Sequence, residues 1–325
     1  MNEDYVQNLR YKLQKRVRRL NSVDTQLFQA SLKQFWVFLD SQPTLKAITE
    51  SLVVACPTAE ADATTIVDKQ KALLGSTETE GAAIGYCVLK KCVESKDTSQ
   101  AVRIAACYRA RPGEGLDTFR EVFLEPFYDY LDEHLDDGRA LLALLRKYKY
   151  RCEWFHRKRL YDLWEADTIR GEKTLVQDLY EYLFDNGVEF YIEPSSASGK
   201  ADMVSAQTGD EPLIADGKIF NPDRSKDKGY IARGFGQVYQ YTLDFNEPFG
   251  YLIIFKTSEH DLRFALTNST QSTPFVVYNN KTIFLITIDL FPHVNSASKR
   301  GVLAPVEITE GDLIKVTQSR EETPT

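Results

Sequence analysis

Three charged residues in the second half of the chain have the types and the spacing of a catalytic site. Asp216 and Lys218 lie two residues apart in the apolar segment PLIADGKIF, and Asp202 lies upstream in ADMVSA. Successive side chains of a strand leave on opposite faces, so Asp216 and Lys218 share one face. The short connection QTGDE predicts that the two strands pair and bring Asp202 beside Asp216.

Two carboxylates on one sheet face repel each other unless a cation neutralises them. Carboxylate oxygens, completed by water and a substrate phosphate, suit Mg²⁺ or Mn²⁺. The neighbouring Lys218 can orient a water molecule or stabilise charge on the phosphate. The set points to metal-dependent hydrolysis of a phosphodiester bond. The alternative, an exposed Asp–Lys pair on an edge strand, explains Lys218 but not an aspartate between LIA and KIF.

The surrounding segments predict an α/β module around a central mixed sheet, because the apolar period changes from helical to strand-like after residue 187. The helix GEKTLVQDLYEYLFDNG should bury Leu175, Leu179 and Leu183, and Asn279-Asn280 should form a hairpin turn. The expected elements after this helix are the strands VEFYIEP, ADMVSA and PLIADGKIF, the helix YIARGFGQVYQYTLDF, and the strands FGYLIIFKT and FVVYNNKTIFLITIDLF.

Asp202, thirteen intervening residues and then Asp216-Gly217-Lys218 resemble the signature of the PD-(D/E)XK nuclease superfamily. The element order from about residue 171 to 291 is also similar to the core of that family. The resemblance implies a restriction-endonuclease-like fold and a Mg²⁺-dependent nuclease acting on DNA rather than RNA. It implies that Asp202 and Asp216 bind the metal and that Lys218 is catalytic. Ala201 stands where many members have proline.

The flanking helices extend this resemblance. The first core helix of such nucleases often carries a glutamate that joins the metal site, which Glu172 matches best and Glu181 second. Gln237 and Tyr241, four residues apart and hence on one helix face, resemble the Q-x-x-x-Y motif of RecB-like members, which positions substrate and catalytic groups. Each of these residues also has a structural interpretation. Glu172 could be an acidic residue at a helix start, where the helix dipole favours it, and Gln237 and Tyr241 could serve ordinary packing.

Two segments rich in Lys and Arg are candidate phosphate contacts. Residues 145–160 interleave seven basic residues with aromatics, although a solvated helix face would have the same pattern. Residues 221–234 lie between the D-G-K strand and the Q-x-x-x-Y helix, and should therefore form the rim of the site. The candidate nucleic-acid contacts are Lys147, Arg151, Arg157, Lys158, Lys200, Arg224, Lys226, Lys228 and Arg233.

The first half of the chain predicts helices throughout. We expect an all-helical domain over residues 1–165, with a sensing, regulatory or oligomerising role, and a nuclease-like domain over 166–325 that ends in the polar tail QSREETPT. A long helix from about residue 137 to 167 should present one buried face. That face is formed by Leu141, Leu145, Tyr148, Cys152 and Phe155.

Composition excludes several classes of protein. The net charge of −7 gives no global attraction to nucleic acid, so any anion site must be local. The five cysteines form no C-x-x-C pair and the four histidines are isolated, which argues against zinc sites and favours buried free thiols. No apolar run approaches the roughly 20 residues that cross a bilayer. We expect a soluble, cytoplasmic protein with no membrane partner.

Three functions remain open from the sequence. A helical domain fused to such a nuclease suggests, by analogy alone, a bacterial restriction or antiphage effector. The alternatives are a catalytically silent nuclease fold used for binding or assembly, and an RNA-directed nuclease. Further partners, a second copy or another protein, would bind through the helical domain. Endonuclease or exonuclease action, sequence preference, the activating signal and the oligomeric state are not determined by the sequence.

Overall fold

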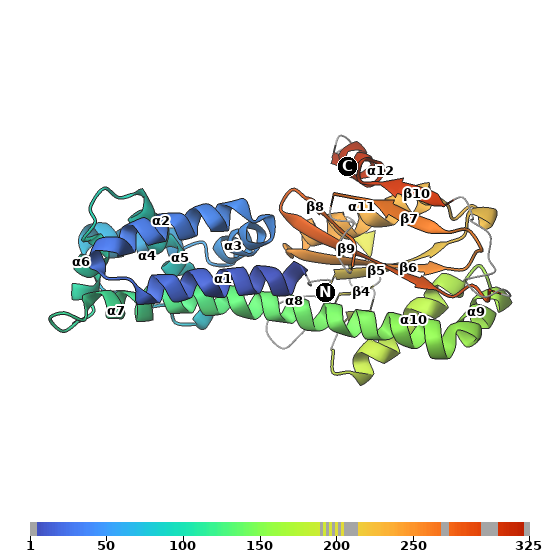
Figure 1. Cartoon of the computed structure of the whole chain (residues 1–325), viewed down its shortest axis with the longest axis horizontal. Helices are drawn as coiled ribbons and strands as arrows, with labels where there is room; N and C mark the ends of the chain where they lie inside the picture. The colour runs from blue at the N-terminus through green and yellow to red at the C-terminus, as the bar shows by residue number, and fades with distance from the viewer. Residues whose placement is uncertain are drawn as a thin grey trace. The chain divides into compact units, whose positions relative to one another are not determined.

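The computed structural model describes residues 5–188, 191–192, 195–196, 199–200, 203–204, 214–267, 273–293 and 305–321 (Figure 1). It is an α+β protein, with a helical first part followed by a mixed sheet and its helices, as the sequence predicts. Its contacts divide the chain into two compact units, here called the helical unit (residues 5–139) and the sheet unit (residues 140–321).

The helical unit is built from short amphipathic helices with local caps. Asp24 caps α2 by accepting hydrogen bonds from the backbone N–H groups of Gln26 and Leu27, and Thr77 caps α5 in the same way. Its elements are α1 (Tyr5–Ser22), α2 (Thr25–Ser41), α3 (Pro43–Ala55), α4 (Ala59–Lys69), α5 (Glu78–Glu94), α6 (Gln100–Ala106), α7 (Gly115–Phe119), the π-helix η1 (Arg120–Leu124) and the start of α8 (Glu125–Arg151).

The sheet unit begins within α8, at residue 140, whereas the sequence analysis placed the domain boundary at 165. Arg146 donates to Thr273 Oγ1 at 2.8 Å, and Tyr148 donates to Asp178 at 3.0 Å, so the end of α8 packs with the later elements. After α8 come the π-helix η2 (Cys152–His156), α9 (Arg157–Ala166) and α10 (Gly171–Asp185).

The predicted buried face of the long helix is correct at Leu145, Tyr148 and Cys152 and wrong at its two ends, where Leu141 is only half-buried and Phe155 is exposed. Leu145, Tyr148 and Cys152 are 0–1% exposed, whereas Phe155 is 73% exposed. The cause is η2, because a π-helical turn holds more residues than an α-helical turn and rotates the following side chains away from the packed face. The leucines of α10 are buried as predicted, at 0–1% exposed.

A six-stranded mixed sheet forms the centre of this unit, in the order β1-β4-β5-β6-β9-β8. Strands β5, β6 and β9 are parallel to one another, and their neighbours β4 and β8 are antiparallel to them. The strands are β1 (Tyr191–Ile192), β4 (Met203–Val204), β5 (Ile214–Phe220), β6 (Phe249–Lys256), β8 (Phe275–Tyr278) and β9 (Lys281–Asp289). Every residue of β5 and β6 is buried, as expected for strands covered on both faces.

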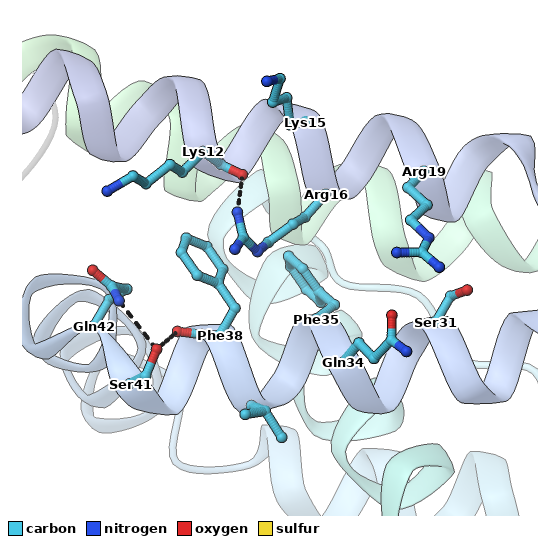
Figure 2. A pocket seen from close by; sticks show the side chains of 11 residues that line it. Lys12, Lys15, Arg16, Arg19, Ser31, Gln34, Phe35, Phe38, Ser41 and Gln42 are labelled. Carbon is cyan, nitrogen blue, oxygen red and sulfur yellow. Dashed lines mark hydrogen bonds between the residues drawn. The ribbon is translucent and has the colours of Figure 1, made fainter.

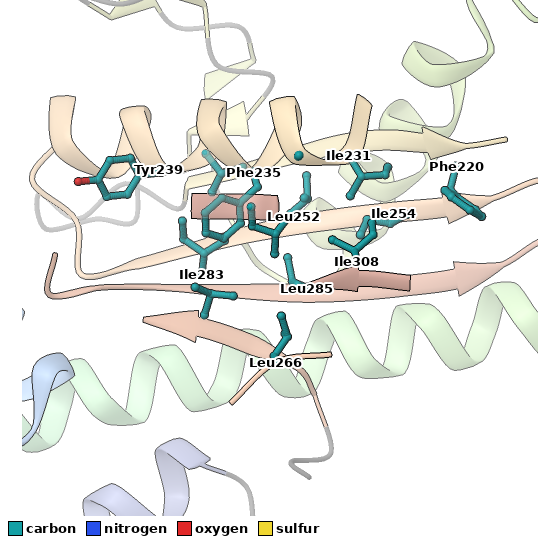
Figure 3. Close-up of a cluster of buried hydrophobic side chains, with 14 of the residues drawn as sticks. Phe220, Ile231, Phe235, Tyr239, Leu252, Ile254, Leu266, Ile283, Leu285 and Ile308 are labelled. Carbon is teal, nitrogen blue, oxygen red and sulfur yellow. The ribbon is translucent and has the colours of Figure 1, made fainter. Parts of the chain in front are cut away.

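Helices cover both faces of the sheet. Helix α11 (Lys228–Asp244) lies on one face, where Phe235 and Ile231 pack with Leu252 and Ile254 of β6 (Figure 3). Helix α10 covers the opposite face, because a methyl group on Gly217 of β5 would lie 2.3 Å from a methyl of Val176. The even-numbered residues of β5 therefore face α11 and the odd-numbered residues face α10.

Smaller elements complete the sheet unit. The turn Asn279-Asn280 joins β8 to β9 as predicted, and both residues have positive φ, which suits a two-residue hairpin. Helix α12 runs to Glu321 and so includes part of the tail that composition predicts to be unstructured. The remaining elements are β2 (Ser195–Ser196), β3 (Gly199–Lys200), the 3-10 helix η3 (Pro222–Arg224), β7 (Leu262–Ala265), β10 (Val306–Thr309) and α12 (Glu310–Glu321).

Two expectations from composition can be compared with the structure. All five cysteines are free and four of them are buried, which confirms the prediction of buried thiols. Burial raises the pKa of Cys87, Cys92 and Cys152 to about 12. Over the described residues, no helix combines the length and the apolar character that crossing a bilayer requires.

Candidate active site on strand β5

Asp216 and Lys218 form a buried ion pair on β5. Asp216 is 4% exposed and Lys218 is 8% exposed, and Lys218 Nζ lies 2.8 Å from Asp216 Oδ2. The prediction that the two side chains share one face is confirmed. Burying an ion pair costs several kcal/mol per charge in desolvation, so a pair of this kind is retained for a specific reason more often than for stability.

Strand β4 pairs with β5 as predicted, since Met203 lies opposite Ala215 and Val204 lies opposite Ile214 in an antiparallel register. Asp202, the predicted partner of Asp216, lies outside the described residues. The backbone of Lys200 belongs to β3, and the placement of its side chain is likewise outside what the structure describes.

Glu172 reaches β5 from the second residue of α10. Its Oε2 accepts a hydrogen bond from the backbone N–H of Ile219 at 3.0 Å, next to Lys218 in the chain. Tyr230 at the start of α11 donates its hydroxyl to the same carboxylate at 2.8 Å. These bonds hold the carboxylate beside the D-G-K segment. An acidic residue that only stabilises the start of a helix does not need this placement. Glu181, the second choice, is exposed on the side of α10.

One stripe of α11 lies over the ion pair. Tyr230, Gly234, Gln237 and Tyr241 follow one another at intervals of four, three and four residues, which places them on one helix face. Gln237 is half-buried and Tyr241 is 7% exposed. The prediction that Gln237 and Tyr241 share a face with the site is therefore consistent with the packing of this helix.

The position of Gln237 follows from its neighbours on α11. A methyl group on Gly234 would lie 2.7 Å from Lys218 Cγ, so glycine lets the lysine stem pass directly beneath the helix. One turn later, Val238 packs on Gly250 at the start of β6, beside the start of β5. Gln237 lies between Gly234 and Val238 in the chain, and therefore between these two contacts along α11.

The basic segment before α11 divides into two groups. Lys226 lies 3.8 Å from the ring centroid of Tyr230 and Arg233 lies 5.7 Å from it, so both stand at the rim next to the tyrosine that binds Glu172. Arg224 instead stacks over Trp164 at 4.9 Å, and Lys228 lies 4.0 Å from Asp312 of α12. The expected rim is thus formed by Lys226 and Arg233.

The basic residues of α8, η2 and α9 have mixed roles. Arg151 bonds Asp178 of α10 at 3.1 Å, and Arg157 bonds the backbone of its own helix at 3.1 Å, so both are held by the fold. Lys147 and Lys158 are exposed. Three aromatic rings in the same segment are exposed: Tyr150 at the end of α8 at 54%, and Trp154 and Phe155 in η2 at 71% and 73%. Exposed rings interleaved with lysines are typical of surfaces that bind unpaired bases.

The donor set fits a hard divalent cation in part. Asp216 and Glu172 supply carboxylate oxygens, which are the ligands that Mg²⁺ prefers. Within the described residues, however, no three His, Cys, Asp or Glu side chains gather closely enough to hold a metal. The third predicted ligand, Asp202, falls outside that part of the chain.

A second lysine–aspartate pair, absent from the sequence predictions, lies where β6 and β9 end, with a buried Lys256 and a half-buried Asp289. Lys256 Nζ lies 3.2 Å from Asp289 Oδ1 on the neighbouring strand and donates to Ser258 O at 2.9 Å. His293 Nε2 lies 2.9 Å from Asp289 Oδ2. Burial alone raises the pKa of Asp289, and Lys256 and His293 outweigh it, so that pKa lies below its usual range.

Tyr230 is the site residue that the sequence predictions missed. Its signal was present, since it lies seven residues before Gln237 and therefore on the same helix face. Its partner, Glu172, is 58 residues away in the chain, and no local pattern joins them. No family model, curated protein or solved structure matches this chain.

Proposed function

We propose that the protein is a Mg²⁺-dependent nuclease that hydrolyses phosphodiester bonds in DNA. One observation carries the proposal: the buried Asp216–Lys218 pair on β5, with the carboxylate of Glu172 fixed beside it by Ile219 and Tyr230. Clustered buried charges with specific partners are typical of functional sites. The restriction-endonuclease-like fold is part of this proposal, supported by the order of α10, β4, β5, α11 and β6.

Each residue has a role that follows from its position. Asp216 and Glu172, together with Asp202, would hold the metal through carboxylate oxygens. Lys218 is the only one of these groups that donates, so it orients the attacking water and stabilises charge on the phosphate oxygens. Gln237 and Tyr241 share the face of α11 on which Gly234 contacts Lys218, and they position the substrate. When bound, Mg²⁺ would stabilise negative charge on the phosphate and lower the pKa of water.

The net reaction adds water across one P–O bond. The water oxygen forms a bond to phosphorus as the bond from phosphorus to the leaving oxygen breaks. The water loses one proton and the leaving oxygen gains one, both exchanged with solvent. Lys226 and Arg233 at the rim, and Lys147 and Lys158 beside the exposed rings, supply the cations that contact phosphates.

The test is cleavage of supercoiled plasmid, linear duplex, single-stranded DNA and RNA, with Mg²⁺ or Mn²⁺ and with EDTA. Wild type is compared with Lys218→Ala and Asp216→Ala, and Lys315→Ala is the matched control because this lysine is exposed on α12. We expect metal-dependent DNA cleavage by wild type and by the control, and loss of at least a hundredfold in the two site variants.

Other results would change the conclusion. Equal cleavage by all four proteins would show contamination or a different site, and cleavage of RNA alone would make the chain an RNA-directed nuclease. If wild type cleaves nothing, calorimetry with Mg²⁺ and Mn²⁺ decides. Metal binding that Asp216→Ala abolishes would indicate a nuclease awaiting a signal, and absence of metal binding would favour a module used for binding or assembly.

A further inference from the structure

A basic groove lies between α1 and α2 in the helical unit (Figure 2). Its volume is about 590 Å³. Four cations from consecutive turns of α1 line one wall, and the side chains of α2 line the other. Figure 2 shows Arg16 and Arg19 extending from α1 toward α2. The lining cations are Lys12, Lys15, Arg16 and Arg19.

None of these four cations pairs with a carboxylate within the described part of the chain, and no acidic residue there lines the groove. Arg10, one turn earlier on the same helix, behaves differently: it forms a 2.7 Å salt bridge with Asp132 and also bonds Asp136. Like charges four residues apart, such as Lys12 with Arg16 and Lys15 with Arg19, destabilise a helix by a few tenths of a kcal/mol per pair. The groove therefore gathers uncompensated positive charge in a chain whose net charge is −7.

The side chains that line the groove are positioned by specific contacts and present polar groups to it. Arg16 is held in place, because its guanidinium lies 3.8 Å from the ring centroid of Phe38 and donates to the carbonyl of Lys12 at 2.9 Å. The floor consists of two buried rings, Phe35 at 1% and Phe38 at 6% exposed. The opposite wall supplies hydroxyl and amide groups that can bond sugar or phosphate oxygens. They are Ser31, Gln34, Ser41 and Gln42.

We propose that this groove binds a compact phosphate-bearing anion of nucleotide size. Its volume falls within the roughly 300–1,000 Å³ that small-molecule sites occupy. Arginine and lysine side chains arranged along one wall recognise several phosphate oxygens at once. The surrounding hydroxyls and amides would fix the sugar or base. This site is separate from the nuclease site and does not depend on the nuclease proposal.

The test measures binding to the full chain by calorimetry, at low and at moderate salt. The probes are ATP, inorganic tripolyphosphate, citrate and a 12-nucleotide single strand. The Lys12→Gln/Arg19→Gln variant removes two exposed cations from the groove. The matched control is Arg18→Gln, since Arg18 is exposed on the same helix outside the groove.

We expect ATP and tripolyphosphate to bind, with affinity at least tenfold lower in the double variant and within twofold of wild type in the control. Tighter binding of ATP than of tripolyphosphate would show that the groove also contacts the nucleoside. Three results would overturn the proposal: no binding of either phosphate probe, citrate binding as tightly as tripolyphosphate, or a strand that binds while ATP does not. Because the readout is binding, failure here leaves the nuclease proposal untouched.

Discussion

The described part of the sheet unit holds two lysine–aspartate pairs with a buried lysine, and these pairs differ in the groups that complete them. Lys256 and Asp289 face each other across neighbouring strands, and the pair also bonds Ser258 and His293. Asp216 and Lys218 lie on one strand, under the stripe of α11 that begins at Tyr230, with Glu172 held next to them. The first pair closes the ends of two strands, whereas the second is surrounded by groups from several elements.

This difference separates two roles that a lysine–aspartate pair can have, one in stability and one in activity. Removing one partner of a cross-strand pair destabilises the fold, because the remaining charge is left without its counter-ion. A pair on one strand, with a second carboxylate fixed against the same strand, gathers more negative charge than folding requires. The first arrangement predicts a cost in stability when it is broken, and the second predicts a cost in activity.

The largest expected effect is on the rate of cleavage, which should fall in variants of the Asp216–Lys218 pair and persist in a variant of the Lys256–Asp289 pair. Asp216→Asn and Lys218→Met should each lower cleavage by about 10²–10³-fold, because each removes a group that acts on the transition state. Lys256→Met should retain cleavage within about threefold at temperatures where it is folded. Initial rates on the preferred substrate, with folding checked by circular dichroism, measure this. Equal losses in both pairs would remove the distinction.

The next expected effect is on stability, where the larger loss is expected for the Lys256–Asp289 pair. Lys256→Met leaves Asp289 without its cation and should lower the free energy of unfolding by roughly 2–3 kcal/mol. The double variant Asp216→Asn/Lys218→Met removes both charges and leaves no buried charge unpaired, so it should cost less than about 1 kcal/mol or even stabilise the fold. Urea denaturation of Lys256→Met and of the double variant is the measurement. A larger loss in the double variant than in Lys256→Met would contradict it.

A substitution at Glu172 should lower the rate of cleavage less than the substitutions at Asp216 and Lys218. Glu172→Gln keeps an oxygen that can accept from Ile219 and Tyr230, but removes the charge. We expect cleavage to fall about tenfold at limiting Mg²⁺ and to recover in part at high Mg²⁺, since fewer anionic ligands weaken metal affinity. Glu181→Gln on the exposed side of the same helix is the control. If rates fall equally in both variants, Glu172 is structural.

The smallest effect concerns pH. The folded-state pKa of Asp289 lies below its unfolded value of about 3.9, because Lys256 and His293 outweigh burial. The stability that this carboxylate contributes is therefore complete above about pH 4 and is lost as the pH falls through the folded pKa. The difference in unfolding free energy between wild type and Asp289→Asn should shrink from pH 6 to pH 3. Denaturation at several pH values tests this, and a constant difference would refute it.

Particular residues show which structural features the sequence patterns predicted and which they missed. Alternation along a strand correctly placed Asp216 and Lys218 on one face, and the leucines of α10 were correctly buried. The same reasoning failed at Phe155, because nothing in a helical repeat reveals a π-helical turn. It also missed the groove, although Lys12, Lys15, Arg16 and Arg19 recur at helical spacing in RYKLQKRVRRL. That pattern shows a basic face but not the neighbour that makes it a groove.

The sequence by itself determined which residues share a face, where helices and strands alternate, and which charges stand among apolar neighbours. These properties depend on side-chain direction within one element, which the backbone period fixes. Only the tertiary structure decided that Glu172 meets Tyr230 and Ile219, that Lys256 meets Asp289, and that α2 supplies the second wall of the α1 groove. Such contacts join segments far apart in the chain, so they depend on how whole elements pack, which no local pattern encodes.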